Sequence, residues 1–215
     1  MPISHAENII FIHIPKTGGG SIEKSLGIFG EDNNGSLNPN LNILYGKKNN
    51  KLLQHLTISE IKGIKNKEYK TYKKITFVRN PFDKLLSEYF WRIQRYGKNK
   101  INTYIKNFYK DEKIISSMDI HYMEQYKFLI NNNNLDVDSI GKFEDFEIDF
   151  KKLFNKKLLN YKINKRKVDY FYYLSKKFLP KFIKKRLYRK FYDNDSRKLV
   201  EEEYKKDLDL FNYNF

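Results

Sequence analysis

The chain has no cysteine among its 215 residues, which excludes disulfides and thiolate metal ligands. Its histidines, His5, His13, His55 and His121, lack the spacing of a metal site, so we expect no metal. No apolar run is long enough to cross a bilayer, and residues 1–8 lack the pattern of a signal peptide. We therefore expect a cytoplasmic protein without a transmembrane segment.

Acidic residues are too few to balance the basic ones. The chain has 42 Lys and Arg against 26 Asp and Glu, which gives a formal net charge of +16. A charge of this size indicates an acidic partner, for which nucleic acid, anionic lipid, an acidic glycan and a phosphorylated cofactor all qualify. Frequent Lys, Asn and Ile indicate a compositional bias, but that bias does not explain the deficit of acidic residues. Charge alone does not choose among these partners.

Apolar side chains are plentiful enough to build a core. Hydrophobic residues make up 40% of the chain, with 17 Tyr and 17 Phe, and this content excludes wholesale disorder despite a mean hydropathy of −0.74. A length of 215 residues suits one domain, and no internal repeat is visible. We expect a single domain over residues 1–215.

The segment from Phe11 to Ile22 carries the first motif. The apolar stretch Ile9–Ile14 predicts a buried strand that ends at Pro15, and a short helix is predicted around Ile22. Between strand and helix lie Lys16, Thr17, Gly18, Gly19, Gly20 and Ser21. A glycine-rich turn between a strand and a helix gathers backbone N–H groups that suit an anion, and the lysine adds a positive charge.

The order of this loop differs from that of the common nucleotide-binding phosphate loop. That loop, G-x-x-x-x-G-K-[ST], carries its lysine near the end. Here Lys16 comes first, so the usual kinase or ATPase assignment does not fit. A plain glycine turn that joins a strand to a helix is the alternative interpretation.

A second predicted strand leads into an arginine and a helix. Lys74–Val78 predicts a buried strand, and Asn80 followed by Pro81 is typical of a helix start, with asparagine as the cap. Between them, Arg79 suits phosphate because its guanidinium donates several hydrogen bonds in a fixed fork. Ser87 lies about two turns into the helix, on a face that can point to the same pocket. The alternative to an anion site is that Arg79 is simply exposed and that Ser87 is a helix residue without a role in binding.

The remaining segments continue the alternation of strands and helices. Val137–Gly141 predicts a third strand, and further helices are expected at about 57–61, 101–109, 122–130, 143–154 and 193–211, with a long loop at 31–50 and a turn at 131–134. This alternation predicts an α/β fold whose central, mainly parallel sheet is flanked by helices. Ligands bind at the carboxyl ends of such strands, and both Lys16–Ser21 and Arg79–Pro81 lie there.

Four segments follow one another in a distinctive order. They are F-I-H-I-P-K-T-G-G-G-S-I from Phe11, H-L-T from His55, F-V-R-N-P-F-D-K-L-L-S-E-Y-F from Phe77 and I-G-K-F-E-D-F from Ile140. Together they resemble the sulfotransferases of the carbohydrate-modifying type, in particular bacterial and viral relatives of the heparan and chondroitin sulfotransferases. The resemblance runs from residue 9 to residue 215 and includes the segments 191–200 and 207–213.

The resemblance implies a donor, 3′-phosphoadenosine 5′-phosphosulfate (PAPS), which is held at its two anionic ends. The loop that holds the 5′-phosphosulfate in that family is matched here by Lys16, Thr17, Gly18, Gly19, Gly20 and Ser21. The pair that holds the 3′-phosphate is matched by Arg79 and Ser87. The implied reaction moves the sulfuryl group to a hydroxyl, which we expect to belong to a saccharide.

The chain departs from the family pattern at several positions. Members often carry alanine where Gly18 stands and threonine where Gly20 stands, so a hydroxyl contact is missing here. Lys84 and Lys142 replace arginines and keep the charge without the fork geometry. A basic, aromatic insertion at about 165–187 stands where relatives are shorter. The role of this insertion stays open. It could contact an anionic polysaccharide, a membrane surface or nucleic acid, or it could form a solvated cover over the donor site.

Sulfuryl transfer needs aligned reactants, a stabilised leaving oxygen and a base. We expect Lys16 to stabilise the leaving oxygen. We expect His55 to be the base, since it lies between the two donor motifs like the histidine base of related glycan sulfotransferases. The alternative for His55 is a structural role as a loop or helix-capping residue. Glu23 is the second candidate base, although first-turn acidic residues are also common for helix-dipole reasons. We expect His13 to be a packed residue inside the strand.

Two other functions stay open at this point. A nucleotide-dependent phosphotransferase would need a Mg²⁺-binding carboxylate at a strand end and a lysine at the far end of the loop, and the sequence offers neither clearly. A non-enzymatic basic module for nucleic acid or a membrane would explain the charge but not two ordered anion motifs. We therefore expect a sulfotransferase without a nucleic-acid partner, and the sequence names neither its acceptor nor its oligomeric state.

Overall fold

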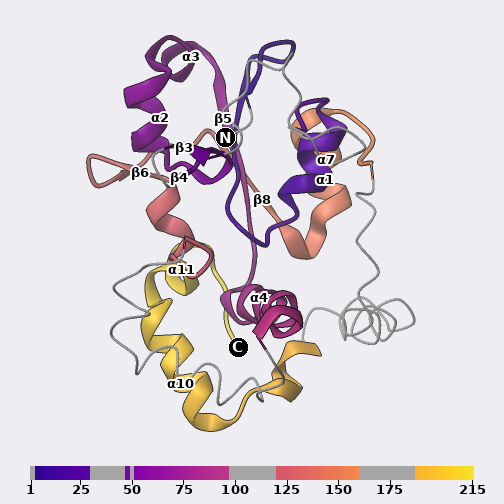
Figure 1. Ribbon diagram of the computed structural model, residues 1–215, viewed down its shortest axis with the longest axis vertical. Coiled ribbons are helices and arrows are strands. Elements are labelled where there is room, and N and C mark those ends of the chain that lie inside the picture. The colour runs from indigo at the N-terminus through magenta and orange to yellow at the C-terminus, as the bar shows by residue number, and fades with distance from the viewer. Residues whose placement is uncertain (1–2, 30–46, 49–50, 97–119, 160–186) are drawn as a thin grey trace. The chain divides into compact units, whose positions relative to one another are not determined.

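The structure is a computed structural model (Figure 1). It describes residues 3–29, 47–48, 51–96, 120–159 and 187–215. The predicted helix at 101–109 and nearly all of the predicted insertion and of the 31–50 loop fall outside these ranges.

The chain divides into two compact units, each built from two stretches of sequence. Unit 1 comprises Met1–Val78 and Gln125–Tyr161, and unit 2 comprises Arg79–Glu124 and Lys162–Phe215. Each unit is described below by itself. The single domain expected from the length stays a prediction.

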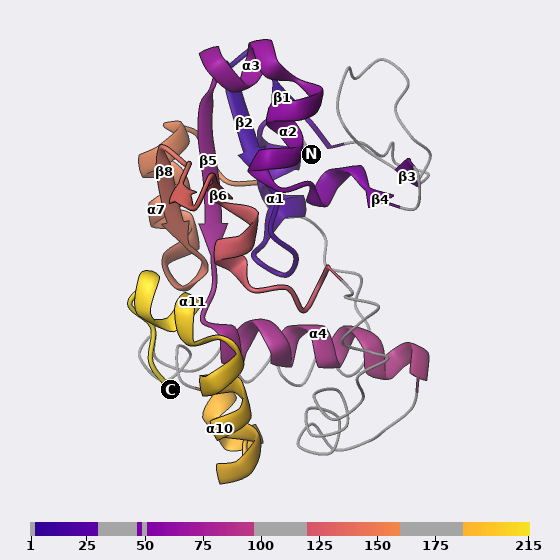
Figure 2. The same cartoon turned by 90° about the vertical axis from the view of Figure 1, so that its left-hand side faces the viewer.

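A four-stranded sheet forms the centre of unit 1 (Figure 2). In spatial order its strands are β1 (Ile3–Ser4), β2 (Ile9–Ile12), β5 (Lys73–Val78) and β8 (Ser139–Lys142). Both β2 and β8 run parallel to β5, while β1 is antiparallel to β2. The mainly parallel sheet predicted from the sequence is confirmed, and the carboxyl ends of β2, β5 and β8 meet at one edge.

Helices cover both faces of this sheet, as Figure 1 shows. On one face, α1 (Gly19–Ser25) and α7 (Phe146–Phe154) bury a cluster made of Ile9, Phe11, Ile22, Leu26, Ile28, Ile75, Phe77, Phe150 and Phe154. On the other side lie α2 (Ile58–Ile64) and α3 (Asn66–Thr71). Because side chains alternate along a strand, a sheet covered on both faces needs unbroken apolar strands, and all four residues of β2 are buried.

Short elements connect the strands of unit 1. After β3 (Lys47–Lys48) and β4 (Lys51–Leu52), a 3-10 turn, η1 (Leu53–His55), leads to α2. Thr57 caps α2 in a capping box. Its backbone N–H donates to Glu60 Oε2 at 2.9 Å, and its Oγ1 accepts from the Glu60 N–H at 3.3 Å. The helix expected at about 57–61 is confirmed.

The segment 122–130 differs from the helix that the sequence predicted. Here η2 (Gln125–Phe128) is a 3-10 turn, and β6 (Ile130–Asn131) pairs with β7 (Asn134–Leu135). Asn132 and Asn133 have φ angles of 50° and 63°, the left-handed pair that a tight hairpin requires and that asparagine tolerates. The helix prediction was wrong because this hairpin takes up the last residues of the apolar pattern, whereas the predicted turn at 131–134 is confirmed.

A polar cluster fastens this hairpin to the start of β5. The Tyr69 hydroxyl and Asn131 Nδ2 both donate to Asp136 Oδ2, the latter at 3.0 Å, and Lys74 Nζ lies 3.3 Å from Asp136 Oδ1. Burial alone would raise the pKa of Asp136, but these hydrogen bonds and the charge of Lys74 outweigh it and lower that pKa. The hydrogen bond to Asp136 raises the pKa of Tyr69 in turn.

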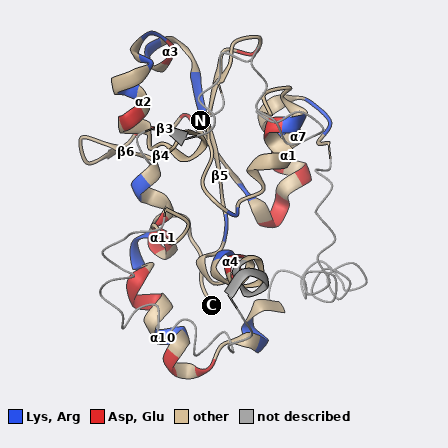
Figure 3. Cartoon of the chain, in the orientation of Figure 1, with Lys and Arg blue, Asp and Glu red and all other residues tan. Residues whose placement is uncertain are grey.

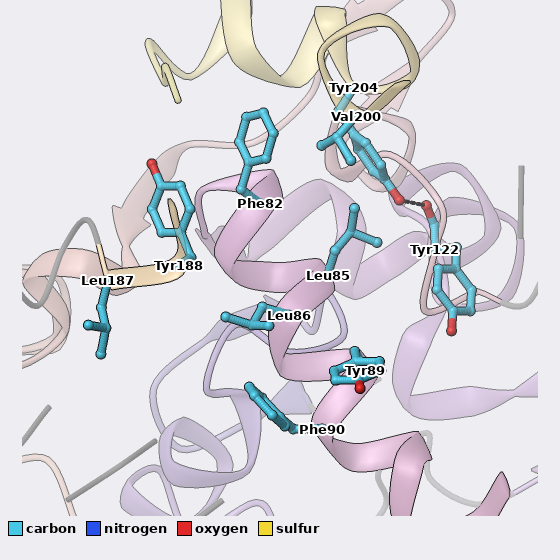
Figure 4. Packing of buried hydrophobic residues seen from close by; sticks show 10 residues of the cluster. All are labelled: Phe82, Leu85, Leu86, Tyr89, Phe90, Tyr122, Leu187, Tyr188, Val200 and Tyr204. Carbon is cyan, nitrogen blue, oxygen red and sulfur yellow. Dashed lines mark hydrogen bonds between the residues drawn. The ribbon is translucent and has the colours of Figure 1, made fainter. Parts of the chain in front are cut away.

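Unit 2 is built around α4 (Pro81–Tyr96), whose first turn is capped as predicted. The Asn80 Oδ1 accepts a hydrogen bond from the Phe82 N–H at 3.0 Å. The described residues of this unit also form η4 (Leu187–Phe191), α10 (Asn194–Glu203) and α11 (Lys205–Leu210). Their shared core, drawn in Figure 4, consists of Phe82, Leu85, Leu86, Tyr89, Phe90, Tyr122, Leu187, Tyr188, Val200 and Tyr204. The apolar side chains of α4 in this cluster therefore form a buried face of the helix.

The excess positive charge is not a property of the described helices. Figure 3 shows basic and acidic residues mixed along α10. Residues 160–186 hold ten Lys and Arg against one Asp, so more than half of the net charge of +16 lies in that stretch. Among the helices that the structure describes, none is long and apolar enough to span a membrane.

Candidate functional site

The loop between β2 and α1 is tightly curled. Lys16 and Gly18 have φ angles of 69° and 88°, which place both residues in the left-handed region. The Thr17 hydroxyl donates to the Ile14 carbonyl at 2.8 Å, and the Ser21 N–H donates to the Gly18 carbonyl at 3.0 Å. Left-handed residues set among right-handed ones turn successive N–H groups toward one side, which is the geometry of an anion-binding nest.

Two glycines of the loop have no room for a side chain. A Cβ atom on Gly18 would lie 2.6 Å from Phe146 Cζ, and one on Gly19 would lie 2.1 Å from His13 Nε2. Both distances are far below van der Waals contact. The alanine that relatives often carry at Gly18 therefore does not fit this arrangement of the loop.

A left-handed backbone costs an L-residue about 1–2 kcal/mol. We expect Gly18→Ala to lower the free energy of unfolding by more than this, because the Phe146 ring must also move. Gly27→Ala is the matched control for the backbone term, since Gly27 has a φ of 69° with nothing within 4 Å. Gly63→Ala, at an open position of α2, should be neutral or stabilising. Urea unfolding of the three variants measures these differences, and equal losses for Gly18→Ala and Gly27→Ala would contradict the crowding argument.

Three polar side chains meet beside this loop: His13 after β2, Glu23 of α1 and His55 of η1. His13 Nδ1 lies 2.5 Å from Glu23 Oε1. His55 Nδ1 donates to the backbone carbonyl of His13 at 2.8 Å. The two imidazole rings stand edge to face, with centroids 4.5 Å apart and planes at 70°. Residues 13, 23 and 55 thus form one connected group.

The structure corrects the predictions for His13 and Glu23. The strand ends at Ile12, so the His13 side chain lies beyond it, 14% exposed and hydrogen-bonded rather than packed in the core. The helix begins at Gly19, so Glu23 lies past its first turn, and its side chain is only 1% exposed. Both predictions were wrong because the strand ends two residues before its expected limit and the helix begins earlier than expected.

The hydrogen bond of His55 fixes its tautomer. A carbonyl oxygen only accepts, so His55 Nδ1 must carry a proton, and the lone pair of the neutral ring is on Nε2. The residue is buried, with 5% exposure. A fixed tautomer with its lone pair on one known atom is what a general base requires. The ring of His55 lies against that of His13, and His13 packs against Gly19 at the start of α1.

Arg79 and Ser87 lie in the first part of unit 2. Arg79 follows the last residue of β5 and is 3% exposed. Its Nε and Nη2 atoms both donate to Asp83 Oδ2, at 3.0 and 2.8 Å. Ser87, one turn beyond Asp83 on α4, is half-buried. Sequence reasoning missed Asp83, although its four-residue spacing from Arg79 is a signal for an ion pair.

The two lysines that replace family arginines make contacts of their own. Lys84 is completely buried, and its Nζ donates to the carbonyls of His121 and Met123, at 2.7 and 3.3 Å. It therefore fastens the segment before η2 to α4. Lys142, at the end of β8, donates its backbone N–H to Asp149 of α7 at 2.7 Å.

The comparisons with known proteins identify the family. A model of the sulfotransferase family matches residues 1–214, a range that covers the glycine loop, His55, Arg79 and both units. No curated protein matches the chain, and no solved structure does. Because this match spans nearly the whole chain, the chain belongs to the sulfotransferase family.

Proposed function

We propose that this protein transfers the sulfuryl group of PAPS to a hydroxyl of a saccharide. The observation that carries the proposal is the curled loop after β2, with left-handed Lys16 and Gly18, in a chain that belongs to the sulfotransferase family. A nest of backbone N–H groups with a lysine at its start suits a 5′-phosphosulfate.

The donor carries negative charge at two ends, and the chain has a feature suited to each. For the 5′-phosphosulfate we propose the loop residues Lys16, Thr17, Gly18, Gly19, Gly20 and Ser21. For the 3′-phosphate we propose Arg79 and Ser87. The carboxylate of Asp83 already holds the guanidinium in one orientation, so less conformational freedom is lost when phosphate binds.

The bound donor supplies a sulfuryl group on a phosphate leaving oxygen. In the proposed reaction the Lys16 ammonium balances the negative charge that develops on that oxygen. His55 takes the proton of the acceptor hydroxyl at Nε2, the atom that its tautomer leaves with a lone pair. The products are a sulfate ester and adenosine 3′,5′-bisphosphate.

A saccharide acceptor is proposed for two reasons. The motifs resemble those of carbohydrate-modifying members of the family. The net charge of +16 also favours an anionic polymer, because opposite charges raise both encounter rates and affinity. Unsulfated glycosaminoglycan chains combine the required hydroxyls with negative charge.

Thermal-shift titration tests the donor assignment. We expect adenosine 3′,5′-bisphosphate to stabilise the protein by about 2.7 kcal/mol at a hundred times its Kd. AMP and ATP lack the 3′-phosphate and should stabilise it less at equal concentration. A larger effect of ATP would favour a phosphotransferase, and no effect of any nucleotide would contradict donor binding. Transfer of labelled sulfate from PAPS to heparosan or unsulfated chondroitin then tests the acceptor class.

A further inference from the structure

Glu23 is a buried carboxylate whose charge needs an explanation. Its side chain is 1% exposed, and a buried carboxylate is costly unless it is paired. In the described part of the chain, the polar side chain that contacts it is His13, at 2.5 Å from Nδ1 to Oε1. This pair therefore places the Glu23 carboxyl group inside unit 1, one imidazole ring away from the start of α1.

The ring of His13 contacts both the start of α1 and the ring of His55. A Cβ on Gly19 would lie 2.1–2.5 Å from three atoms of the His13 ring, so that ring packs directly against the start of α1. The ring also lies edge to face with the His55 ring, and the His13 carbonyl accepts the His55 Nδ1–H. The hydrogen bond to Glu23 fixes the ring of His13, and His13 in turn contacts both the loop and His55.

We propose that Glu23 and His13 are positioning residues for sulfuryl transfer. Glu23 fixes the ring of His13, and its charge offsets the positive charge that His55 gains during the reaction. This inference rests on the proposed function. In the step concerned, the acceptor oxygen forms a bond to sulfur and gives its proton to His55 Nε2. The bond between sulfur and the bridging phosphate oxygen breaks, and its electron pair stays on that oxygen.

The positive charges near the loop give a reason for the Glu23 carboxylate. Lys16, three residues after His13, carries a positive charge, so protonation of His55 adds a second one to the same part of unit 1. A negative charge one imidazole ring away lowers the cost of that second charge, and burial weakens the screening by solvent. Removal of the charge at constant side-chain size should therefore slow transfer without weakening donor binding.

Unit 2 contains a pair of the same chemistry, which serves as a matched control. Glu88 is 0% exposed on its side chain, and its Oε2 lies 2.9 Å from His121 Nδ1. The ring of this histidine stacks on Trp91, with centroids 5.5 Å apart. Neither Glu88 nor His121 has a proposed part in the reaction.

The first experiment compares Glu23→Gln, Glu23→Asp and Glu88→Gln. For Glu23→Gln we expect kcat for release of adenosine 3′,5′-bisphosphate from PAPS, with heparosan or chondroitin as acceptor, to fall about tenfold or more. The Kd of adenosine 3′,5′-bisphosphate and the KM of the acceptor should stay within about twofold. Glu23→Asp keeps the charge and should recover part of the rate, while Glu88→Gln should keep the rate of the wild type. A fall in kcat together with losses of melting temperature and nucleotide affinity would indicate a purely structural pair and overturn the proposal.

The second experiment needs no acceptor. The chain has four histidines, so ¹⁵N NMR spectra of the imidazoles can be assigned from single substitutions. We expect both His13 and His55 of the wild type to carry the proton on Nδ1. In Glu23→Gln the signals of both rings should shift, and in Glu88→Gln only those of His121. Unchanged His55 signals in Glu23→Gln would overturn the coupling.

Failure of the inference can be distinguished from failure of the proposed function. If the wild type binds adenosine 3′,5′-bisphosphate and transfers sulfate while Glu23→Gln is equally active, the inference alone fails. If the wild type does neither, the proposed function fails, and the inference fails with it whatever the NMR signals show. Should Glu23→Gln not fold, His13→Asn keeps an N–H donor toward Glu23, and an unchanged kcat in that variant would overturn the role of the ring.

Discussion

Replacement of Lys16 by alanine should reduce sulfate transfer by about a hundredfold to a thousandfold, the range typical of the loss of one group that stabilises a developing oxyanion. The charge is removed where the proposed leaving oxygen lies, while the loop amides remain. Lys24→Ala is the control, because this exposed lysine belongs to the adjoining helix and has no proposed role. Initial rates with labelled PAPS measure both variants.

Arg79→Ala should abolish measurable binding of adenosine 3′,5′-bisphosphate, since the proposed 3′-phosphate contact is lost and the buried Asp83 carboxylate loses the contacts that the guanidinium makes with it. Arg79→Lys keeps the charge but not the fork and should bind weakly. Arg197→Ala is the matched control, because it removes an arginine that pairs with a carboxylate four residues on, at 2.8 Å, on α10. Full activity of both Lys16→Ala and Arg79→Ala would contradict the donor assignment.

The parallel sheet was predictable because a strand buried on both faces needs apolar residues at nearly every position. Ile9–Ile12 is buried throughout, as are the last four residues of β5. The start of α4 was equally predictable, because the asparagine cap and the proline are local signals that lie within three residues of each other. The hairpin after η2 was predictable only at its turn, because the apolar residues that precede the turn have a helical spacing.

The candidate site was predictable only in part. The glycine loop, His55 and Arg79 came from local motifs and from the resemblance that these motifs carry. The contact between His13 and Glu23 joins the end of a strand to the middle of a helix, and it depends on a loop in which a lysine takes a left-handed conformation. No local pattern predicts that conformation. The contact between His13 and Glu23 could therefore not be predicted from the sequence.

His55→Ala should lower turnover by about a hundredfold or more, the usual effect of losing a general base, while the Kd of adenosine 3′,5′-bisphosphate stays unchanged. The separation is expected because the proposed donor contacts come from the loop and from Arg79. His5→Ala is a suitable control, since His5 is exposed and bonds only to Tyr72 among the side chains that the structure describes. Single-turnover rates and nucleotide titrations measure the two effects separately.

His55→Asn distinguishes the base from a purely structural residue. The side-chain amide of asparagine can still donate to the His13 carbonyl, so it preserves the contact that His55 Nδ1 makes, worth about 1 kcal/mol, but it cannot take a proton. If the base is what matters, His55→Asn should be as slow as His55→Ala while it melts closer to the wild type. If instead His55→Asn restores turnover, the hydrogen bond is the function of this residue, and the proton must go to another group, for which His13 with its Glu23 partner is the nearest candidate.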